Sequence, residues 1–94
     1  MYDVIIIGAG PAGITAGLYT KRSNLNTLVI YKDEASIEKA EHIENYYGFE
    51  DGVSGKELYK KGIEQAKNLK IEIKKEEVIN VQINENGFEV ITEK

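Results

Sequence analysis

The sequence contains no cysteine and no tryptophan, and it has one proline and one histidine among its 94 residues. The lack of cysteine excludes disulfides, thiolate metal sites, iron–sulfur clusters and cysteine redox chemistry carried by this chain. Basic side chains are also in short supply, since 12 of them against 16 acidic ones give a net charge of −4. Nucleic-acid grooves and anionic membrane surfaces require clustered lysine and arginine, so neither partner is expected.

Long hydrophobic runs are missing as well. The apolar run Val4–Ile7 is far too short for a membrane helix, and Gly8 to Pro11 interrupts it. No basic segment precedes this run, so it does not have the form of a signal peptide. The sequence therefore predicts a soluble, cytoplasmic protein, and its length allows one domain.

Hydrophobic patterning predicts a βαβ unit at residues 2–31. The continuous β-branched run in residues 2–7 is typical of a parallel strand covered on both faces. A helix over 12–22 follows, and a second strand covers 26–31. A polar connection over 32–53, with a possible helical turn at 36–41, leads to a helix over 54–68. A capping box formed by Ser54 and Glu57 marks the start of that helix.

The last quarter of the chain predicts three more strands. The first covers residues 70–75, and two others, at 78–83 and 88–92, form a hairpin around the turn 84–87. The predicted order is β-α-β-loop-α-β plus a β-hairpin. This order indicates the α/β class, as a three-layer Rossmann-like fold for binding FAD or NAD(P).

A glycine-rich turn joins the first strand to the first helix. Gly8, Gly10 and Gly13 form the pattern G-x-G-x-x-G between a buried strand and a helix. In this pattern the first glycine permits the sharp turn, the second lets a pyrophosphate approach the backbone, and the third lets the helix lie close to the strand. The helix N-terminus then faces the anion. Dinucleotide binding is the favoured interpretation, and a turn needed only for tight packing is the alternative.

The acidic residue that normally ends the second strand of such a unit is missing or displaced. Tyr31 occupies that position, and Lys32, Asp33 and Glu34 follow it. Asp33 or Glu34 could bind ribose hydroxyls from the loop, or they could simply be solvated. Lys32 could instead meet a phosphate. The motif alone therefore leaves NAD, NADP and FAD open.

Two segments resemble the low-molecular-weight thioredoxin reductases, which are FAD-containing pyridine nucleotide–disulfide oxidoreductases. The first is residues 2–19, in which Pro11-Ala12-Gly13 ends the glycine motif. The second runs from Ile43 through Glu44-Asn45-Tyr46-Tyr47-Gly48-Phe49 and continues into Gly52-Val53-Ser54-Gly55 and Glu57-Leu58. The resemblance covers nearly the whole chain but only the first third of a family member, which implies a partial FAD-binding domain over 1–94.

The resemblance also implies particular binding residues and partners. The predicted FAD contacts are Gly8, Ala9, Gly10, Pro11, Ala12 and Gly13 at the pyrophosphate, Tyr31 and Lys32 near the adenosine ribose, Asn45 toward the flavin, and Val78 by its backbone at the adenine. As an alternative to contacting the flavin, Asn45 could be an Asx-type turn residue ahead of Gly48. The parent enzyme would pass electrons from NADPH or another donor through FAD to a thioredoxin-like disulfide. Glycines common in the family's loop are absent from residues 34–37, which leaves the donor open.

This resemblance implies no catalytic residue within the chain, because the family's redox cysteine pair is absent. Glu41, Glu44 and Asp51 lack metal-ligand spacing, so no metal site is expected. His42 could be a solvated residue or could transfer a proton near the flavin. We further expect self-association, with either the edge of the strand Val4–Ile7 or the hairpin in the contact, because the apolar strand would leave one edge unpaired.

Overall fold

The computed structural model describes residues 1–32 and 39–93. Within these residues the chain forms, in order, β1 (Val4–Ile7), α1 (Pro11–Arg22), β2 (Thr27–Tyr31), α2 (Gly55–Asn68), β3 (Glu72–Lys75), β4 (Val78–Asn84) and β5 (Gly87–Thr92). This order confirms the α/β prediction. Asp33, Glu34 and the first half of the predicted turn at 36–41 lie outside the described residues.

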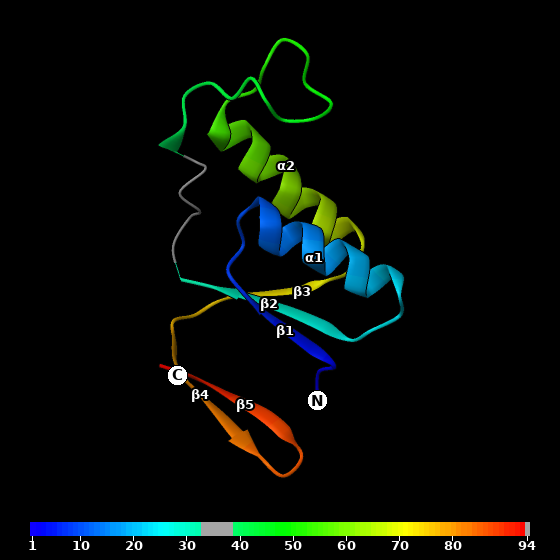
Figure 1. Cartoon of the computed structure of the whole chain (residues 1–94), viewed down its shortest axis with the longest axis vertical. Helices are drawn as coiled ribbons and strands as arrows, with labels where there is room; N and C mark the ends of the chain where they lie inside the picture. The colour runs from blue at the N-terminus through cyan, green and yellow to red at the C-terminus, as the bar shows by residue number, and fades with distance from the viewer. Residues whose placement is uncertain (33–38, 94) are drawn as a thin grey trace.

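A parallel sheet with the order β1-β2-β3 forms the centre of the fold. Ile5 pairs with Leu28, which in turn pairs with Glu72 on the other side of β2. Helices α1 and α2 lie along one face of this sheet, and the β4–β5 hairpin lies on the opposite side (Figure 1). The carboxyl ends of β1 and β2 therefore reach the same edge of the sheet, where the glycine-rich turn begins.

The hydrophobic core lies between the sheet and the two helices. Its buried residues are Ala9, Ile14, Val29, Ala66 and Ile71. Val29, in the middle strand β2, has no exposed surface. Every residue of β2 except Tyr31 is buried, because a strand lies on each side of it. The strand predicted at 26–31 is thus confirmed over Thr27–Tyr31, and it is the buried middle strand of a parallel sheet.

Three details of the predicted elements are wrong. The run at residues 2–7 forms a strand only over Val4–Ile7, and Ile7 at its end is 55% exposed. Ile7 is exposed because, among the described residues, β1 pairs with β2 alone. Residue Lys70 has a φ of 61°, so the third strand starts at Glu72 instead of 70. The hydrophobic periodicity of residues 54–69 places Leu69 on the inner face of α2, but in the structure Leu69 caps that helix and is 47% exposed.

The hairpin presents one apolar face. Val81 lies opposite Val90, and Ile83 lies opposite Phe88. The two central turn residues are Glu85 and Asn86, and Gly87 follows with a φ of 133°. Val81, Phe88 and Val90 line a hollow of about 530 Å³ together with Ile5 and Ile7 of β1. The hairpin thus faces the side of β1 that the helices do not cover.

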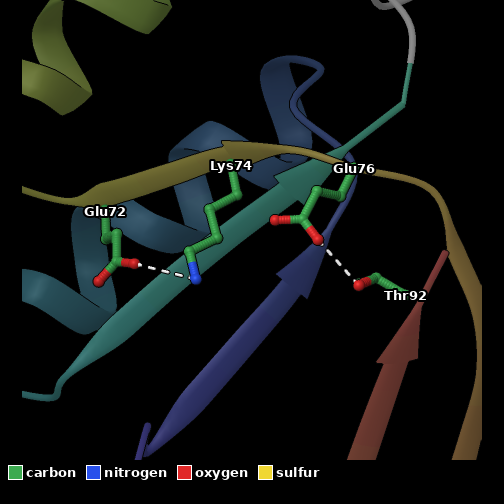
Figure 2. Close-up of polar contacts among 4 residues, drawn as sticks. All are labelled: Glu72, Lys74, Glu76 and Thr92. Atoms are coloured by element: carbon green, nitrogen blue, oxygen red, sulfur yellow. Dashed lines mark hydrogen bonds and ion pairs between the residues drawn. The ribbon is translucent and has the colours of Figure 1, made fainter. Parts of the chain in front are cut away.

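Tyr2 interacts with the carboxylate of Glu72. A hydrogen bond to the Glu72 carboxylate, with smaller effects of burial and of the Glu72 charge, raises the pKa of Tyr2 above its ordinary value of 10.0. Lys74 lies 3.6 Å from the same carboxylate (Figure 2). A raised pKa means that the folded state favours the neutral phenol. This contribution is present below pH 10 and is lost as the pH rises through the folded-state value.

We therefore expect the free energy of unfolding to fall as the pH rises above 10, and to fall less in the Tyr2→Phe variant. Urea unfolding at several pH values measures both slopes. Tyr47→Phe is the matched control, because Tyr47 is 98% exposed. Equal slopes for the wild type and Tyr2→Phe would contradict the role given to Tyr2.

Candidate dinucleotide site

The glycine-rich turn leaves β1 at Gly8 and returns as helix α1. Gly8 has a φ of 120°, a left-handed conformation that favours glycine, and its N–H donates to the Ile30 carbonyl at 2.7 Å. This bond ties the turn to β2. Ala9 is buried in the core, while Gly10 and Pro11 line a cavity beside it. The structure thus brings the predicted residues of the turn together at the carboxyl end of β1.

Gly13 is the point of closest approach between α1 and the turn. A Cβ atom at this position would collide with the Gly8 carbonyl oxygen and lie 3.4 Å from the Ile6 side chain. Four residues on, a Cβ at Gly17 would meet Ile6, Val29 and Ile71 at ordinary contact distances of 3.5 to 3.8 Å. Packing alone therefore requires glycine at position 13 but not at position 17.

Among the described residues, no side chain caps the N-terminus of α1. Gly10 is its N-cap residue in an extended conformation, Pro11 follows, and the first turn contains no acidic residue. In α2, by contrast, the Ser54 hydroxyl accepts a hydrogen bond from the Glu57 N–H at 3.1 Å. The first N–H groups of a helix have no partner within it, and they attract anions. Within the part of the chain that the structure describes, a side chain meets an N–H group at the start of α2, but none does so at the start of α1.

A loop from the middle of the chain reaches the same place. Tyr46 and Phe49 line a cavity of about 200 Å³ together with Gly10 and Pro11. Their rings lie 6.2 Å apart, centre to centre. Asn45 does not line this cavity. It lies in an exposed hollow formed by its own loop, residues 44–50, where its side chain hydrogen-bonds to no described residue. The alternative of a hydrogen-bonded turn residue therefore gains no support.

Backbone pairing closes this loop at its base. Ile43 and Val53 exchange hydrogen bonds of 2.7 and 3.0 Å, and Val53 is buried. Gly52 has a φ of 87°, and a Cβ there would collide with the His42 ring. His42 lies 3.7 Å from Glu44, and both side chains are exposed. Nothing in this arrangement favours a proton-transfer role over the solvated one.

The remaining predicted residues meet at the carboxyl end of β2. The Tyr31 ring packs against the core, and its carbonyl accepts a hydrogen bond from the Glu76 N–H at 2.9 Å. The Lys32 ammonium lies 3.1 Å from a carboxylate oxygen of Glu77, directly before Val78. Lys32 and Val78, which are far apart in the sequence, are therefore neighbours in space.

Sequence reasoning missed the two glutamates that join these segments. The Glu76 carboxylate accepts a hydrogen bond from the Thr92 hydroxyl at 2.8 Å (Figure 2). The Glu77 carbonyl accepts one from the Glu93 N–H at 3.0 Å. An acidic pair between two strands is an ordinary surface feature in a sequence, so no signal pointed to it. Among the described residues no group of histidine, aspartate and glutamate side chains could hold a metal ion.

A parallel βαβ unit whose glycine-rich turn opens onto an uncapped helix defines a dinucleotide-binding α/β protein. Comparison with known proteins gives the family. The chain belongs to the pyridine nucleotide-disulphide oxidoreductases, whose family model matches residues 2–94. It corresponds to the FAD-binding portion of low-molecular-weight thioredoxin reductases, which confirms the resemblance. The family binds FAD and NADPH.

Individual relatives agree with this assignment. A thioredoxin reductase of Aquifex aeolicus is 46% identical over 94 residues, which is 98% of this chain and 29% of that protein. The structure of Lactococcus lactis thioredoxin reductase matches 99% of this chain and 31% of that one, with a TM-score of 0.93 and 37% identity. A ferredoxin-flavin thioredoxin reductase of Clostridium acetobutylicum matches 99% of this chain and 33% of that one, with a TM-score of 0.83 and 34% identity.

This chain therefore spans about a third of the length of the relatives that it matches. No helix within residues 1–32 and 39–93 has the length and apolar character needed to cross a membrane.

The contrast between Gly13 and Gly17 gives a matched pair of variants. Gly13→Ala should destabilise the fold by roughly 1–3 kcal/mol, because the added methyl group displaces α1 from the turn. Gly17→Ala fills available space inside a helix and should stabilise the fold by roughly 0.5–1 kcal/mol. Urea unfolding measures both. Equal effects of the two substitutions would contradict the close approach at Gly13.

Proposed function

We propose that this chain binds FAD as part of a flavoprotein that passes electrons from a reduced nicotinamide, or another donor, to the disulfide of a thioredoxin-like protein. The observation that carries the proposal is the uncapped N-terminus of α1 behind the turn Gly8–Gly13, in a chain of this family. FAD would supply the redox chemistry, and the protein would supply binding and orientation. The 94-residue chain by itself is expected to be inactive, because it has no cysteine.

Each predicted residue has a place in this proposal. The turn residues Gly8, Ala9, Gly10, Pro11, Ala12 and Gly13 would surround the pyrophosphate. Tyr31 and Lys32 would lie near the adenosine ribose, and the backbone of Val78 near the adenine. Asn45 would approach the flavin from its exposed loop. The free N–H groups at the start of α1 suit the pyrophosphate, since an anion there gains both hydrogen bonds and the helix dipole.

The electron donor stays open within this proposal. A relative named as a ferredoxin-flavin thioredoxin reductase is 34% identical to this chain, so donors other than a nicotinamide occur among its relatives. The loop that lacks the family's glycines, residues 34–37, lies outside the described residues. A second candidate function is a stand-alone dinucleotide-binding module without catalysis, which the same turn would serve.

Substitution at the helix caps tests anion binding separately from folding. Gly10→Asp places a favourable N-cap residue on α1, so the helix should keep its stability. The new carboxylate occupies the free N–H groups and repels the pyrophosphate, so FAD affinity should fall roughly 10- to 100-fold. Ser54→Asp makes a comparable change at the cap of α2 and should leave FAD affinity unchanged. Titration of FAD followed by flavin fluorescence measures these affinities.

The same titration with NAD separates the candidate functions. Binding of FAD in preference to NAD supports the proposal, and co-elution of flavin absorbance with the chain adds to it. Binding of NAD alone favours the stand-alone module. If neither nucleotide binds, or if Gly10→Asp binds FAD as tightly as the wild type, the proposed role of the turn is wrong.

We also propose that the isolated chain self-associates through the edge of β1. Strand β1 pairs only with β2 in the part of the chain that the structure describes, and Ile7 is 55% exposed. Unpaired edge strands with apolar side chains invite pairing with another chain. A second copy offers an identical edge, so a two-fold arrangement of β1 against β1 could pair both at once.

Light scattering over a range of concentrations tests this self-association. The wild type should increase in mass with concentration, and Ile7→Lys should shift the equilibrium toward monomer, because a charge at an edge opposes strand pairing. Leu69→Lys is the control, since it places a lysine at a similarly exposed leucine away from β1. A wild type that stays monomeric at high concentration contradicts the proposal.

A further inference from the structure

The end of β2 lacks the carboxylate that dinucleotide-binding folds place there to bind ribose hydroxyls. Tyr31 ends the strand, its ring packs against the core, and its carbonyl already accepts a hydrogen bond. Lys32 follows with a positive charge. No carboxylate of β2 or of the residue that follows it can therefore take this role.

A carboxylate from another part of the chain lies at this position. Glu77 stands between β3 and β4, and one of its oxygens, Oε2, lies 3.1 Å from the Lys32 ammonium. Its side chain is 39% exposed, so solvent or a ligand can reach it. The ion pair with Lys32 uses one oxygen of the carboxylate, which leaves Oε1 for a ligand.

The backbone around Glu77 is held on both sides. The N–H of Glu76 donates to the Tyr31 carbonyl at 2.9 Å, and the Glu77 carbonyl accepts from the Glu93 N–H at 3.0 Å. The side chain of Glu76 accepts a hydrogen bond from the Thr92 hydroxyl at 2.8 Å, as Figure 2 shows. Glu77 is thus fixed to the end of β2 and to the end of β5 at once. A residue held in this way is preorganised for a ligand.

We propose that Glu77 is the residue that binds the adenosine ribose, taking the role normally played by an acid at the end of the second strand. Its carboxylate accepts hydrogen bonds from the vicinal 2′- and 3′-hydroxyls, and Lys32 orients it. The same charge repels a ribose that carries a 2′-phosphate. Glu77 thereby favours the adenosine of FAD or NAD over that of NADP. This inference rests on the proposed binding of FAD.

The test compares two probes that differ by one hydroxyl group. ADP and 2′-deoxy-ADP are titrated calorimetrically into the wild type, where the loss of a hydrogen bond to a charged group should weaken binding about tenfold. In Glu77→Gln the two probes should bind almost equally, and FAD affinity should fall about tenfold. Glu89→Gln removes the same charge from an exposed position on β5 and should keep the preference for ADP.

Each outcome has a distinct meaning. If Glu77→Gln weakens ADP and 2′-deoxy-ADP equally and lowers the free energy of unfolding, the ion pair with Lys32 is only structural and the inference is wrong. A wild type that binds FAD but does not prefer ADP to 2′-deoxy-ADP also overturns it, while the proposed function survives. If the wild type binds no FAD at all, both fail.

Discussion

The close approach of α1 to the glycine-rich turn at Gly13 is the constraint on which the rest of this fold depends. The Gly8 carbonyl occupies the space where a side chain at position 13 would lie, so only glycine lets the helix begin there. With the helix start fixed, Ile14 enters the core and Gly17 comes within contact distance of Ile6, Val29 and Ile71. The same constraint places the N-terminus of α1, which has no side-chain cap among the described residues, next to the carboxyl end of β1. Packing of the core and exposure of free N–H groups thus have one origin.

The position of the β4–β5 hairpin depends on contacts between distant parts of the chain. An antiparallel pair of strands is marginal by itself, so the hairpin needs bonds at its base to hold a fixed position. Glu76 and Glu77 supply these bonds. At the end of β2, the Glu76 N–H donates to the Tyr31 carbonyl and Glu77 forms an ion pair with Lys32. At the end of β5, Glu76 accepts from the Thr92 hydroxyl and the Glu77 carbonyl accepts from the Glu93 N–H. These bonds lie at the rim of the sheet, where parallel α/β folds bind their ligands. The residues that fix the hairpin therefore also shape the site.

Local patterns in the sequence were sufficient for the order of the elements and for the turn. The strand β2, the glycine-rich turn before α1 and the cap of α2 each depend on neighbouring residues. The strand and the turn were predicted correctly, and of the capping box the Ser54 half is present, since its hydroxyl accepts from the Glu57 N–H. The burial of β1 was wrong because it depends on which strands pair with it. The Lys32–Glu77 pair could not be predicted, since it joins residues 45 positions apart whose charges look like ordinary surface charges. The burial of β1 and the Lys32–Glu77 ion pair both depend on which distant segments pair in the folded chain, and hydrophobic periodicity carries no information about that pairing.

The polar groups of this chain are distributed unevenly along the proposed cofactor. The proposals assign the free N–H groups of α1, the carboxylate of Glu77 and the backbone of Val78 to the ADP half of FAD. Only Asn45, exposed on its loop, is assigned to the flavin. Because charge-assisted hydrogen bonds are stronger than neutral ones, most of the affinity of this chain should come from the ADP half. Selectivity for a flavin then requires further contacts, and the relatives have about two-thirds of their length outside the matched segment in which to provide them.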